Sequence, residues 1–330
     1  MSDLILDDKE TSFDRTLRPK KLKDFVGQEK IKKGLKIFLA AAQKRKESVE
    51  HILFHGPPGL GKTTLAYIIA QELNVPIKTT SGSAIERVGD LAAILTSLSE
   101  HEILFFDEIH RLNRHLEEIL YPAMEEGKVD LVIGKGPSAQ VLRLDLPAFT
   151  LIGATTKFAA LSSPMRERFG IVYRLNFYNE EEIKKIIRRS AEILGINIEE
   201  AAVSEIAKRS RFTPRIANRL LKRIKDFADV ENKKKIDSVL AKKALDILEI
   251  DEIGLDDLDR KILEILADKF GGGPVGLNAL SLALVEDKNT LEEICEPYLL
   301  QLGFINRTPK GRIITARGIR HLKNKNSKLF

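Results

Sequence analysis

The sequence contains little cysteine and no long hydrophobic run, and both absences narrow the classes of protein that it can encode. Its single cysteine, Cys295, has no partner for an internal disulfide, which suits a reducing compartment. No stretch approaches about 18 uninterrupted apolar residues, so we expect no membrane span. The first four residues, MSDL, lack the basic region and the apolar stretch of a signal peptide. We therefore expect a cytoplasmic protein.

Internal repeats and long low-complexity tracts are also missing. At 330 residues the chain is too long for one ordinary core and predicts two or three domains. It is 43% hydrophobic and 31% charged, so it can bury substantial cores and stay soluble. The net charge of +6 is modest, but basic residues gather in Arg307–Arg320 and Lys323–Lys328. A basic tail is often only a solvated end, so this charge does not identify a partner by itself.

A glycine-rich run, GPPGLGKTT at positions 56–64, fits the phosphate-binding pattern GxxxxGK[ST]. The apolar stretch His51–His55 before it predicts a buried strand, and Leu65–Leu73 after it continues as a helical pattern. Backbone N–H groups of such a loop and the helix N-terminus bind phosphate. Lys62 would reach the β- and γ-phosphates, and the Thr63 hydroxyl would bind Mg²⁺. A glycine-rich turn that happens to precede Lys-Thr is the alternative, and the flanking elements favour a nucleoside triphosphate site.

Hydrolysis needs a second group of residues, and the run HEILFFDE at positions 101–108 supplies one. It predicts an apolar strand that ends in two adjacent acids. Asp107 would hold the magnesium ion, usually through water. Glu108 would polarise the attacking water as a general base. Two solvated acids that open a loop are the alternative, but the preceding apolar run and the upstream phosphate loop favour the catalytic interpretation.

Strands and helices alternate through the first half of the chain. Further strand candidates are Pro76–Thr80, Ile103–Phe106, Thr150–Ala154 and Ile171–Leu175. This alternation predicts an α/β domain with a parallel sheet and helices on both faces. The segment 129–146 interrupts it, because two β-prone runs around Gly-Lys-Gly-Pro predict a hairpin that exposes Val132, Ile133 and Val141. Such a hairpin either packs on its own domain or acts as a partner-binding or translocating finger, and the sequence does not decide between the two.

Beyond Tyr178 the strand patterns stop. Four helical patterns follow, joined by short turns: Glu180–Leu194, Glu199–Arg209, Pro214–Ala228 and Ser238–Leu248. They predict a small helical bundle. Asn179 and Glu182 form a capping-box pair at its first helix, and Gly195 suits the C-terminal end of that helix.

A third unit begins near Leu255. Its helical stretches are Asp256–Phe270, Leu277–Val285 and Thr290–Gln301, and a two-stranded turn follows at 305–314. Thr290 and Glu293 match a capping box at the start of the last stretch. Three helices followed by a basic hairpin are typical of a winged helix, a relative of helix-turn-helix DNA readers. Cys295 lies in an apolar helical pattern, which favours a buried small side chain over a nucleophile.

Together these residues resemble the RuvB family of AAA+ ATPases, which drive branch migration of Holliday junctions. The resemblance runs from about Asp14 to His321. It rests on LRP at 17–19, DFVGQ at 24–28, DEIHRL at 107–112, LIGATT at 151–156, RFG at 168–170, TPRIANR at 213–219 and RTPKGR at 307–312. It implies a P-loop AAA+ domain over 1–178, a helical lid over 179–252 and a C-terminal winged-helix DNA-binding domain over 253–330.

The resemblance also implies a set of nucleotide contacts. Leu17 and Arg18 would lie against the adenine and ribose, and Tyr178 with the lid would close the base pocket. Further implied contacts are Gly59, Leu60, Gly61, Thr64, Glu126, Gly127 and Lys128. The family commonly has an aromatic residue where Gly127 stands, so this position would contribute only backbone here. ATP and Mg²⁺ are the implied cofactors.

Three polar residues have implied roles in hydrolysis. Thr156 matches the polar sensor of the γ-phosphate, although a threonine there could simply cap a strand. Arg168 matches the arginine finger that reaches into the neighbouring subunit's site, with Arg166 as a nearby competitor for that role. Arg215 would contact phosphate from its own subunit. An arginine finger that acts on the neighbouring subunit implies a ring of subunits. The resemblance implies that this ring is a hexamer.

DNA and protein partners follow from the same resemblance. Lys288, Arg307, Lys310 and Arg312 would contact DNA phosphates with salt-dependent, sequence-independent affinity. The family usually shows arginine where this chain has Lys288, Lys310 and Lys157, and lysine lacks the bidentate fork. The hairpin 129–146 would dock RuvA, which binds the four-way DNA junction, and the RuvC resolvase would join the complex.

Two alternatives remain at the level of sequence. A clamp-loader-type ATPase shares the phosphate loop, the acid pair and the lid, but it does not usually end in a basic winged helix. A nucleotide-gated DNA-binding switch would bind ATP and seldom hydrolyse it. Glu108 and Arg168 argue against such a switch, since it needs neither a general base nor a finger. The sequence therefore predicts an ATP-driven DNA translocase.

Overall fold

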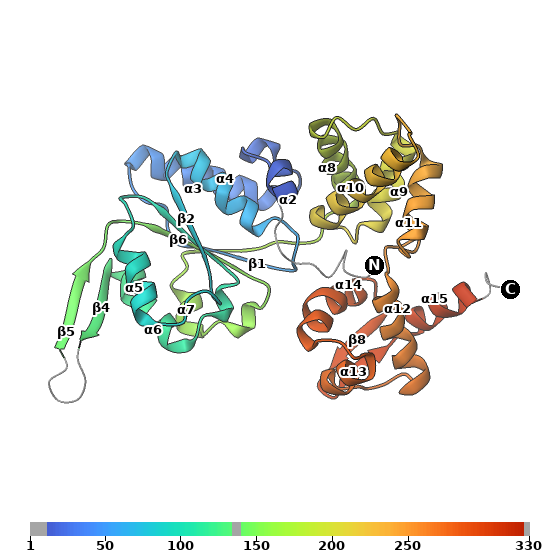
Figure 1. Cartoon of the computed structure of the whole chain (residues 1–330). Helices are drawn as coiled ribbons and strands as arrows, with labels where there is room; N and C mark the ends of the chain where they lie inside the picture. Colours follow the sequence, from blue (N-terminus) through green and yellow to red (C-terminus); the bar gives the residue numbers. More distant parts are fainter. Residues whose placement is uncertain (1–11, 134–139, 327–330) are drawn as a thin grey trace. The chain divides into compact units, whose positions relative to one another are not determined.

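The computed structural model describes residues 12–133 and 140–326, which fall into two compact units (Figure 1). The sheet unit comprises Arg18–Gly56 and Gly61–Asn176. Of the described residues, the helical unit comprises 12–17, Pro57–Leu60 and 177–326. No helix among the described residues is long and apolar enough to cross a membrane.

The sheet unit is built on five parallel strands in the order β2-β3-β6-β1-β7. Their bounds are β1 (Ile52–His55), β2 (Ile77–Ser81), β3 (Ile103–Asp107), β6 (Thr150–Thr155) and β7 (Ile171–Arg174). All five strands predicted from the sequence are confirmed to within one residue at each end. The three central strands β3, β6 and β1 could be recognised because central strands of a parallel sheet are buried on both faces and are therefore largely apolar. The edge strands β2 and β7 are more exposed and mix apolar with polar residues.

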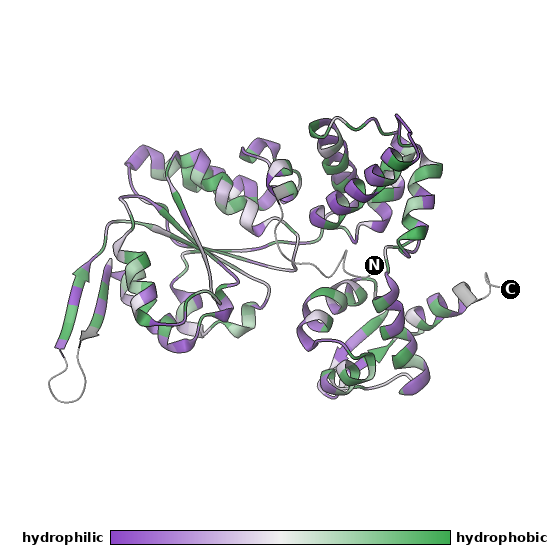
Figure 2. Ribbon diagram, viewed as in Figure 1, coloured by the Kyte–Doolittle hydropathy of each residue, from purple (hydrophilic) through white to green (hydrophobic). Residues whose placement is uncertain are grey.

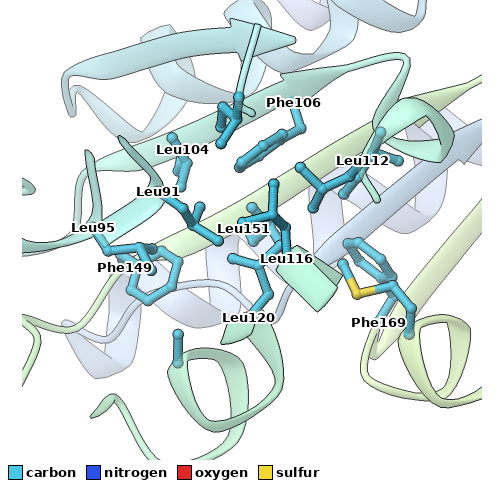
Figure 3. Close-up of a cluster of buried hydrophobic side chains, with 14 of the residues drawn as sticks. Leu91, Leu95, Leu104, Phe106, Leu112, Leu116, Leu120, Phe149, Leu151 and Phe169 are labelled. Atoms are coloured by element: carbon cyan, nitrogen blue, oxygen red, sulfur yellow. The ribbon is translucent and has the colours of Figure 1, made fainter. Parts of the chain in front are cut away.

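Helices cover both faces of this sheet (Figure 1). They are η1 (Leu22–Asp24), α3 (Glu29–Arg45), α4 (Lys62–Leu73), α5 (Val88–Thr96), η2 (Ile109–Arg111), α6 (Arg114–Glu125), η4 (Phe158–Ala160) and α7 (Ser163–Glu167). Side chains alternate along β3, so Leu104 and Phe106 enter one apolar core with α5 and α6 (Figure 3). Phe105 faces the other way and is fully buried, on the side where α4 packs. The predicted three-layer arrangement is confirmed.

The predicted hairpin is confirmed as β4 (Lys128–Ile133) paired antiparallel with β5 (Gln140–Asp145). Its base belongs to the domain core, since Val129 is fully buried opposite Leu144. Farther along, Val141 is 65% exposed and Leu142 is 42% exposed, and Figure 2 shows hydrophobic residues on β5. The hairpin therefore packs on its own domain at one end and presents aliphatic surface at the other. The side chains of Val132 and Ile133 and the turn at 134–139 lie outside the described residues.

The helical unit begins with α2 (Ser12–Leu17) and continues as the predicted bundle. Its helices are α8 (Glu180–Ile193), α9 (Glu200–Arg209), α10 (Pro214–Val230) and α11 (Ser238–Ile247). The capping box is confirmed, because Glu182 N donates to Asn179 Oδ1 at 2.8 Å and Asn179 N donates to Glu182 Oε2 at 2.9 Å. Gly195 follows α8 with φ +63°, as a helix C-terminus favours.

The winged helix is also confirmed. Its elements are α12 (Asp257–Glu264), the π-helix η5 (Ile265–Lys269), α13 (Leu277–Leu284), the π-helix η6 (Thr290–Cys295), α14 (Glu296–Gln301), β8 (Ile305–Thr308), β9 (Gly311–Ile314) and α15 (Ala316–Asn326). Cys295 is buried, as expected. The capping box at Thr290 is wrong: Asn289 is already helical (φ −69°, ψ −38°), and Leu291 N donates to Asp287 O at 3.2 Å. Thr290 therefore lies inside the first turn and not at its N-cap.

A buried ionic cluster joins the bundle to the winged helix within the helical unit. Arg211, 2% exposed, places Nη2 2.9 Å from Asp256 Oδ2 and 2.5 Å from Asp259 Oδ2. Burial raises the pKa of Asp259 to about 8; Arg211 opposes this shift, and Asp256 adds to it. One guanidinium faces two buried carboxylates, so Asp259 keeps its proton where an exposed aspartate has lost it.

We expect this cluster to make folding stability depend on pH. The folded-state pKa of Asp259 lies above its unfolded value of about 3.9. Between those values the folded state binds the extra proton, so the free energy of unfolding falls as pH rises from about 4 to 8. Asp259→Asn should flatten this slope in urea unfolding followed by circular dichroism. Asp257→Asn, on the more exposed neighbouring acid, should keep it, and an unchanged slope in Asp259→Asn would contradict the assignment.

Candidate ATPase site and DNA-binding surface

The phosphate loop connects β1 to α4, as predicted. Gly61 adopts φ +101° immediately before the first residue of α4. Only glycine reaches such a conformation without strain, and it directs the loop into the helix N-terminus. Lys62 is 6% exposed, and its Nζ donates to Gly56 O at 2.7 Å. The lysine is therefore folded back over the loop that is expected to hold phosphate.

The acid pair lies at the carboxyl end of β3. This strand is separated from β1 only by β6, and the carboxyl ends of parallel strands share one edge of a sheet. Asp107 ends β3 and accepts a hydrogen bond at Oδ1 from Glu108 N at 3.1 Å. The Asp107 carboxylate and the Thr63 hydroxyl are hard oxygen donors, and Mg²⁺ in nucleotide sites takes one or two such ligands besides phosphate and water. The donor set fits this ion.

The Glu108 carboxylate is held by three groups. Its Oε2 accepts hydrogen bonds from Thr156 Oγ1 at 3.0 Å and Thr156 N at 3.2 Å, and lies 3.0 Å from His110 Nδ1. Burial raises the pKa of Glu108, but the His110 hydrogen bond, the Lys62 charge and the Thr156 amide outweigh it and bring the pKa to about 2. Glu108 is therefore ionised at neutral pH and can accept a proton from water.

His110 is a site residue that the sequence reasoning missed. Besides Glu108, its Nδ1 lies 2.9 Å from Thr155 Oγ1, at the end of β6. The histidine thus connects the loop after β3 to the neighbouring strand and fixes the carboxylate between them. Its signals in the sequence are its place two residues after the acid pair and its membership of the run DEIHRL at 107–112, which by itself assigns no role to the histidine. Thr156, expected to sense the γ-phosphate, here donates a hydrogen bond to Glu108, the expected general base.

Arg168 ends α7, and its guanidinium is covered by the domain that carries it. Nη1 donates to Pro164 O at 2.8 Å, and Nη2 lies 3.1 Å from Glu125 Oε1. The competing Arg166 has a different environment: its Nη2 donates to Ser163 Oγ at 2.8 Å, and its guanidinium lies 5.2 Å from the centre of the Phe158 ring.

In the helical unit, two lid residues contact the phosphate-loop residues that this unit includes. Tyr178 is 4% exposed, and its Oη donates to Leu60 O at 3.0 Å. Arg215 N donates to Gly59 O at 3.4 Å. A side chain at Gly59 would begin 3.0 Å from Arg215 Cβ, at a backbone φ of +76°. Glycine is thus required where the loop backbone approaches α10.

The other expected nucleotide residues lie in separate places. Leu17 is 2% exposed, and its carbonyl accepts from Arg189 Nη1 at 2.8 Å. Arg18 stacks over the Tyr67 ring, with its guanidinium carbon 4.1 Å from the ring centre. Thr64 follows Thr63 in the first turn of α4, Glu126 ends α6 and Lys128 starts β4. Gly127 has φ +64°, and its carbonyl accepts from Leu146 N at 2.7 Å, which closes the base of the hairpin.

Three of the four expected DNA contacts are exposed on the winged helix: Lys288, Arg307 and Lys310. Arg307 also pairs with Glu292 at 3.0 Å. Arg312 departs from the expectation. It is 7% exposed, and its Nη2 donates to the buried Glu296 at 3.0 Å, with a second bond from Nε to the same carboxylate. Its side chain holds β9 to α14 and is not presented to solvent, because two buried charges stabilise each other there.

Comparison with known proteins covers nearly the whole chain. Three family models match in order: the Holliday junction DNA helicase RuvB P-loop domain at residues 17–175, the RuvB AAA lid domain at 178–251 and the RuvB C-terminal winged helix domain at 252–323. The chain is 55% identical over 314 residues to the Holliday junction branch migration complex subunit RuvB of Fusobacterium nucleatum, covering 95% of each chain. The chain belongs to the RuvB family.

Solved structures of the family agree with this assignment. The RuvB Holliday junction branch migration motor of Thermotoga maritima matches with a TM-score of 0.86 at 50% identity, over 93% of this chain and 98% of that one. A variant of the same protein gives a TM-score of 0.87. The clamp-loader alternative is set aside, because the matched models include the RuvB winged helix.

The exposed Lys310 and the buried Arg312 allow a test of which RuvB-family wing residues touch DNA. We expect Lys310→Ala to lower the slope of log K against log salt by about one for duplex DNA, without changing thermal stability. Arg312→Ala leaves Glu296 buried without its partner, which should cost about 3–5 kcal/mol of winged-helix stability. Fluorescence anisotropy across a salt series and thermal unfolding report the two effects. Loss of DNA affinity in Arg312→Ala at unchanged thermal stability would restore Arg312 as a direct contact.

Proposed function

We propose that this chain is the ATP-hydrolysing motor that drives branch migration of Holliday junctions in recombination and DNA repair. The observation that carries the proposal is an ionised, hydrogen-bonded Glu108 beside a phosphate loop, in a chain that also ends in a basic winged helix. The first feature suits ATP hydrolysis, and the second suits contact with any DNA sequence. The names of the relatives support the same activity.

ATP and Mg²⁺ are the cofactors that these residues suit. Thr63 and Asp107 would hold the ion, which supplies charge neutralisation to the phosphates when bound. Lys62 would turn from the Gly56 carbonyl to the phosphates. Glu108 would accept the proton of the attacking water, with Thr156 and His110 fixing its carboxylate. Tyr178 and Arg215 would convey the nucleotide state to the lid through their contacts with Leu60 and Gly59.

The position of Arg168 supports action on a neighbouring subunit. It precedes β7, and β7 runs parallel to β1 with Ile171 beside Ile52. Arg168 therefore lies toward the amino ends of the strands, whereas the phosphate loop of its own chain follows the carboxyl end of β1. A residue at that edge suits a second copy of the chain better than its own nucleotide. We propose a ring of such copies, a hexamer by family resemblance.

The exposed aliphatics Val141 and Leu142 support the hairpin as the docking site for RuvA. RuvA would bring the ring to the four-way junction, and RuvC would act in the same complex. Lys288, Arg307 and Lys310 would hold the duplex arms. We place this machinery in the cytoplasm, where a chain with one buried cysteine stays reduced.

The proposal is tested with a labelled synthetic four-way junction, a cognate RuvA, ATP and Mg²⁺. We expect the junction to be converted into two duplexes, and conversion to need ATP. Lys62→Ala should abolish it, because the phosphates lose their lysine. Junction binding with no conversion by the unmodified chain would contradict the motor function and favour a DNA-binding switch.

A further inference from the structure

One face of α6 is lined by three polar side chains at a spacing of four residues: Glu117, Tyr121 and Glu125. Residues four apart lie above one another on a helix, so the three form a row. The row faces α7 and the arginine that ends it. The expected roles of the nucleotide-site residues use none of these three side chains.

The first part of the row is a buried chain of hydrogen bonds. Glu117 is 4% exposed, and Ser162 Oγ donates to its Oε2 at 2.5 Å. Tyr121 Oη lies 2.9 Å from Ser162 Oγ. Since the serine proton is used toward the carboxylate, the tyrosine hydroxyl is the donor in that bond. Ser162 Oγ also accepts from Met165 N at 3.3 Å and so caps α7. The Tyr121 ring is thereby fixed relative to α7.

The second part of the row contacts the guanidinium of Arg168. The guanidinium carbon lies 4.2 Å from the centre of the Tyr121 ring, a cation–π distance. Nη2 lies 3.1 Å from Glu125 Oε1, and only 21% of the arginine side chain is exposed. Ring and carboxylate together allow the long side chain few orientations.

The backbone at Arg168 is fixed from the other side. Met165 is fully buried and Phe169 is 4% exposed, and both belong to the core cluster shown in Figure 3. These residues bracket Arg168 in sequence. We therefore expect a mutation of Tyr121 or Glu125 to change the direction of the guanidinium without moving α7 off the core.

We propose that Tyr121 and Glu125 of α6 are positioning residues for Arg168, and that they set the direction in which it reaches the neighbouring nucleotide. The inference rests on the proposed action of Arg168 on a second subunit. A misplacement of about 1 Å costs on the order of 100-fold in rate where geometry is critical. Loss of the row should thus lower hydrolysis in the neighbouring subunit while the subunit's own nucleotide site stays intact.

The test uses rings mixed from two defective chains. A Glu108→Gln chain cannot hydrolyse ATP but donates a finger, and an Arg168→Ala chain lacks a finger but keeps its site. The mixture should recover hydrolysis that neither chain shows alone. Glu125→Ala is then placed in either chain. We expect it to lower the recovered rate about 10- to 100-fold in the finger-donating chain and by less than about twofold in the Arg168→Ala chain.

Several variants separate positioning from general damage. Glu125→Gln keeps the length and an acceptor oxygen, so it should recover part of the rate that Glu125→Ala loses. Tyr121→Phe removes only the hydroxyl bond to Ser162. It should also lower the recovered rate of hydrolysis only when it is placed in the finger-donating chain. Glu118→Ala is the matched control on α6, since its side chain is 55% exposed and pairs with Arg114 at 3.8 Å.

The outcomes distinguish the two claims. No recovered hydrolysis in the starting mixture contradicts action on a neighbour and with it the proposed ring mechanism. Recovered hydrolysis that Glu125→Ala lowers equally from both chains, or does not lower, overturns the positioning role alone. A higher recovered rate with Glu125→Ala in the finger-donating chain also overturns the positioning role. The Glu125 carboxylate would then restrain Arg168 instead of orienting it.

Discussion

We expect the Arg168→Ala variant to hydrolyse ATP about 10³- to 10⁵-fold more slowly than the unmodified chain. Negative charge is spread over the transferring phosphoryl group in the transition state, and an arginine that reaches this group stabilises that charge. Removing the arginine therefore lowers the rate of hydrolysis. Nucleotide affinity should change little, because Arg168 lies at the opposite edge of the sheet from its own phosphate loop. Arg168→Ala should therefore lower the turnover number for ATP hydrolysis and not the affinity for ATP.

Steady-state release of phosphate and binding of a fluorescent ATP analogue measure the two quantities. Arg166→Ala is the matched control, since Arg166 lies two residues away and its guanidinium contacts Phe158 and Ser163 instead of α6. The account expects that control to stay within a few-fold of the unmodified rate. A large loss in Arg166→Ala with a small one in Arg168→Ala would reverse the assignment of the finger.

The second large effect is expected for Glu108→Gln. Removing a general base typically costs about 10²–10⁴ in rate, and glutamine keeps the size and the hydrogen bonds from Thr156. The variant should bind ATP normally and turn it over only at this reduced rate. Glu118→Gln, on an exposed acid of the next helix, should hydrolyse at the normal rate. Turnover by Glu108→Gln within a few-fold of normal would favour the nucleotide-gated switch.

The low pKa of the Glu108 carboxylate also allows a prediction of how the turnover number depends on pH under acidic conditions. Because the pKa of Glu108 is lowered to about 2, the carboxylate stays ionised as pH falls and is protonated only near that value. The turnover number should therefore show no acid limb from Glu108 between about pH 5 and 8. If the turnover number fell on the acid side of that range, and this fall disappeared in Glu108→Gln, the pKa of Glu108 would lie far above about 2.

The sequence was sufficient for most patterns that are local. The phosphate loop, the acid pair at the end of β3 and the capping box at Asn179 each depend on residues within a few positions of one another. The central strands of the parallel sheet could be placed because their burial makes them largely apolar. Their order in the sheet was not predicted, since it depends on crossovers that no local pattern encodes.

Long-range pairings are where sequence reasoning failed. Arg312 belongs to a basic segment, and only the fold shows that Glu296, on another element, takes its charge. No role could be assigned to His110 or Tyr121 from the sequence, because only strand order and helix packing bring Thr155, Ser162 and Arg168 to them. The Thr290 capping box is a local pattern that also failed, because the helix begins further back than the pattern indicates.

The most direct test of the account measures ATP turnover and junction movement in the same sample. A four-way junction with homologous arms, carrying a fluorophore pair across the branch point, reports conversion while a coupled assay reports phosphate. We expect both signals to appear together with RuvA, ATP and Mg²⁺, and both to disappear in Lys62→Ala and in Arg168→Ala. ATP hydrolysis at a normal rate with a stationary branch point would contradict it.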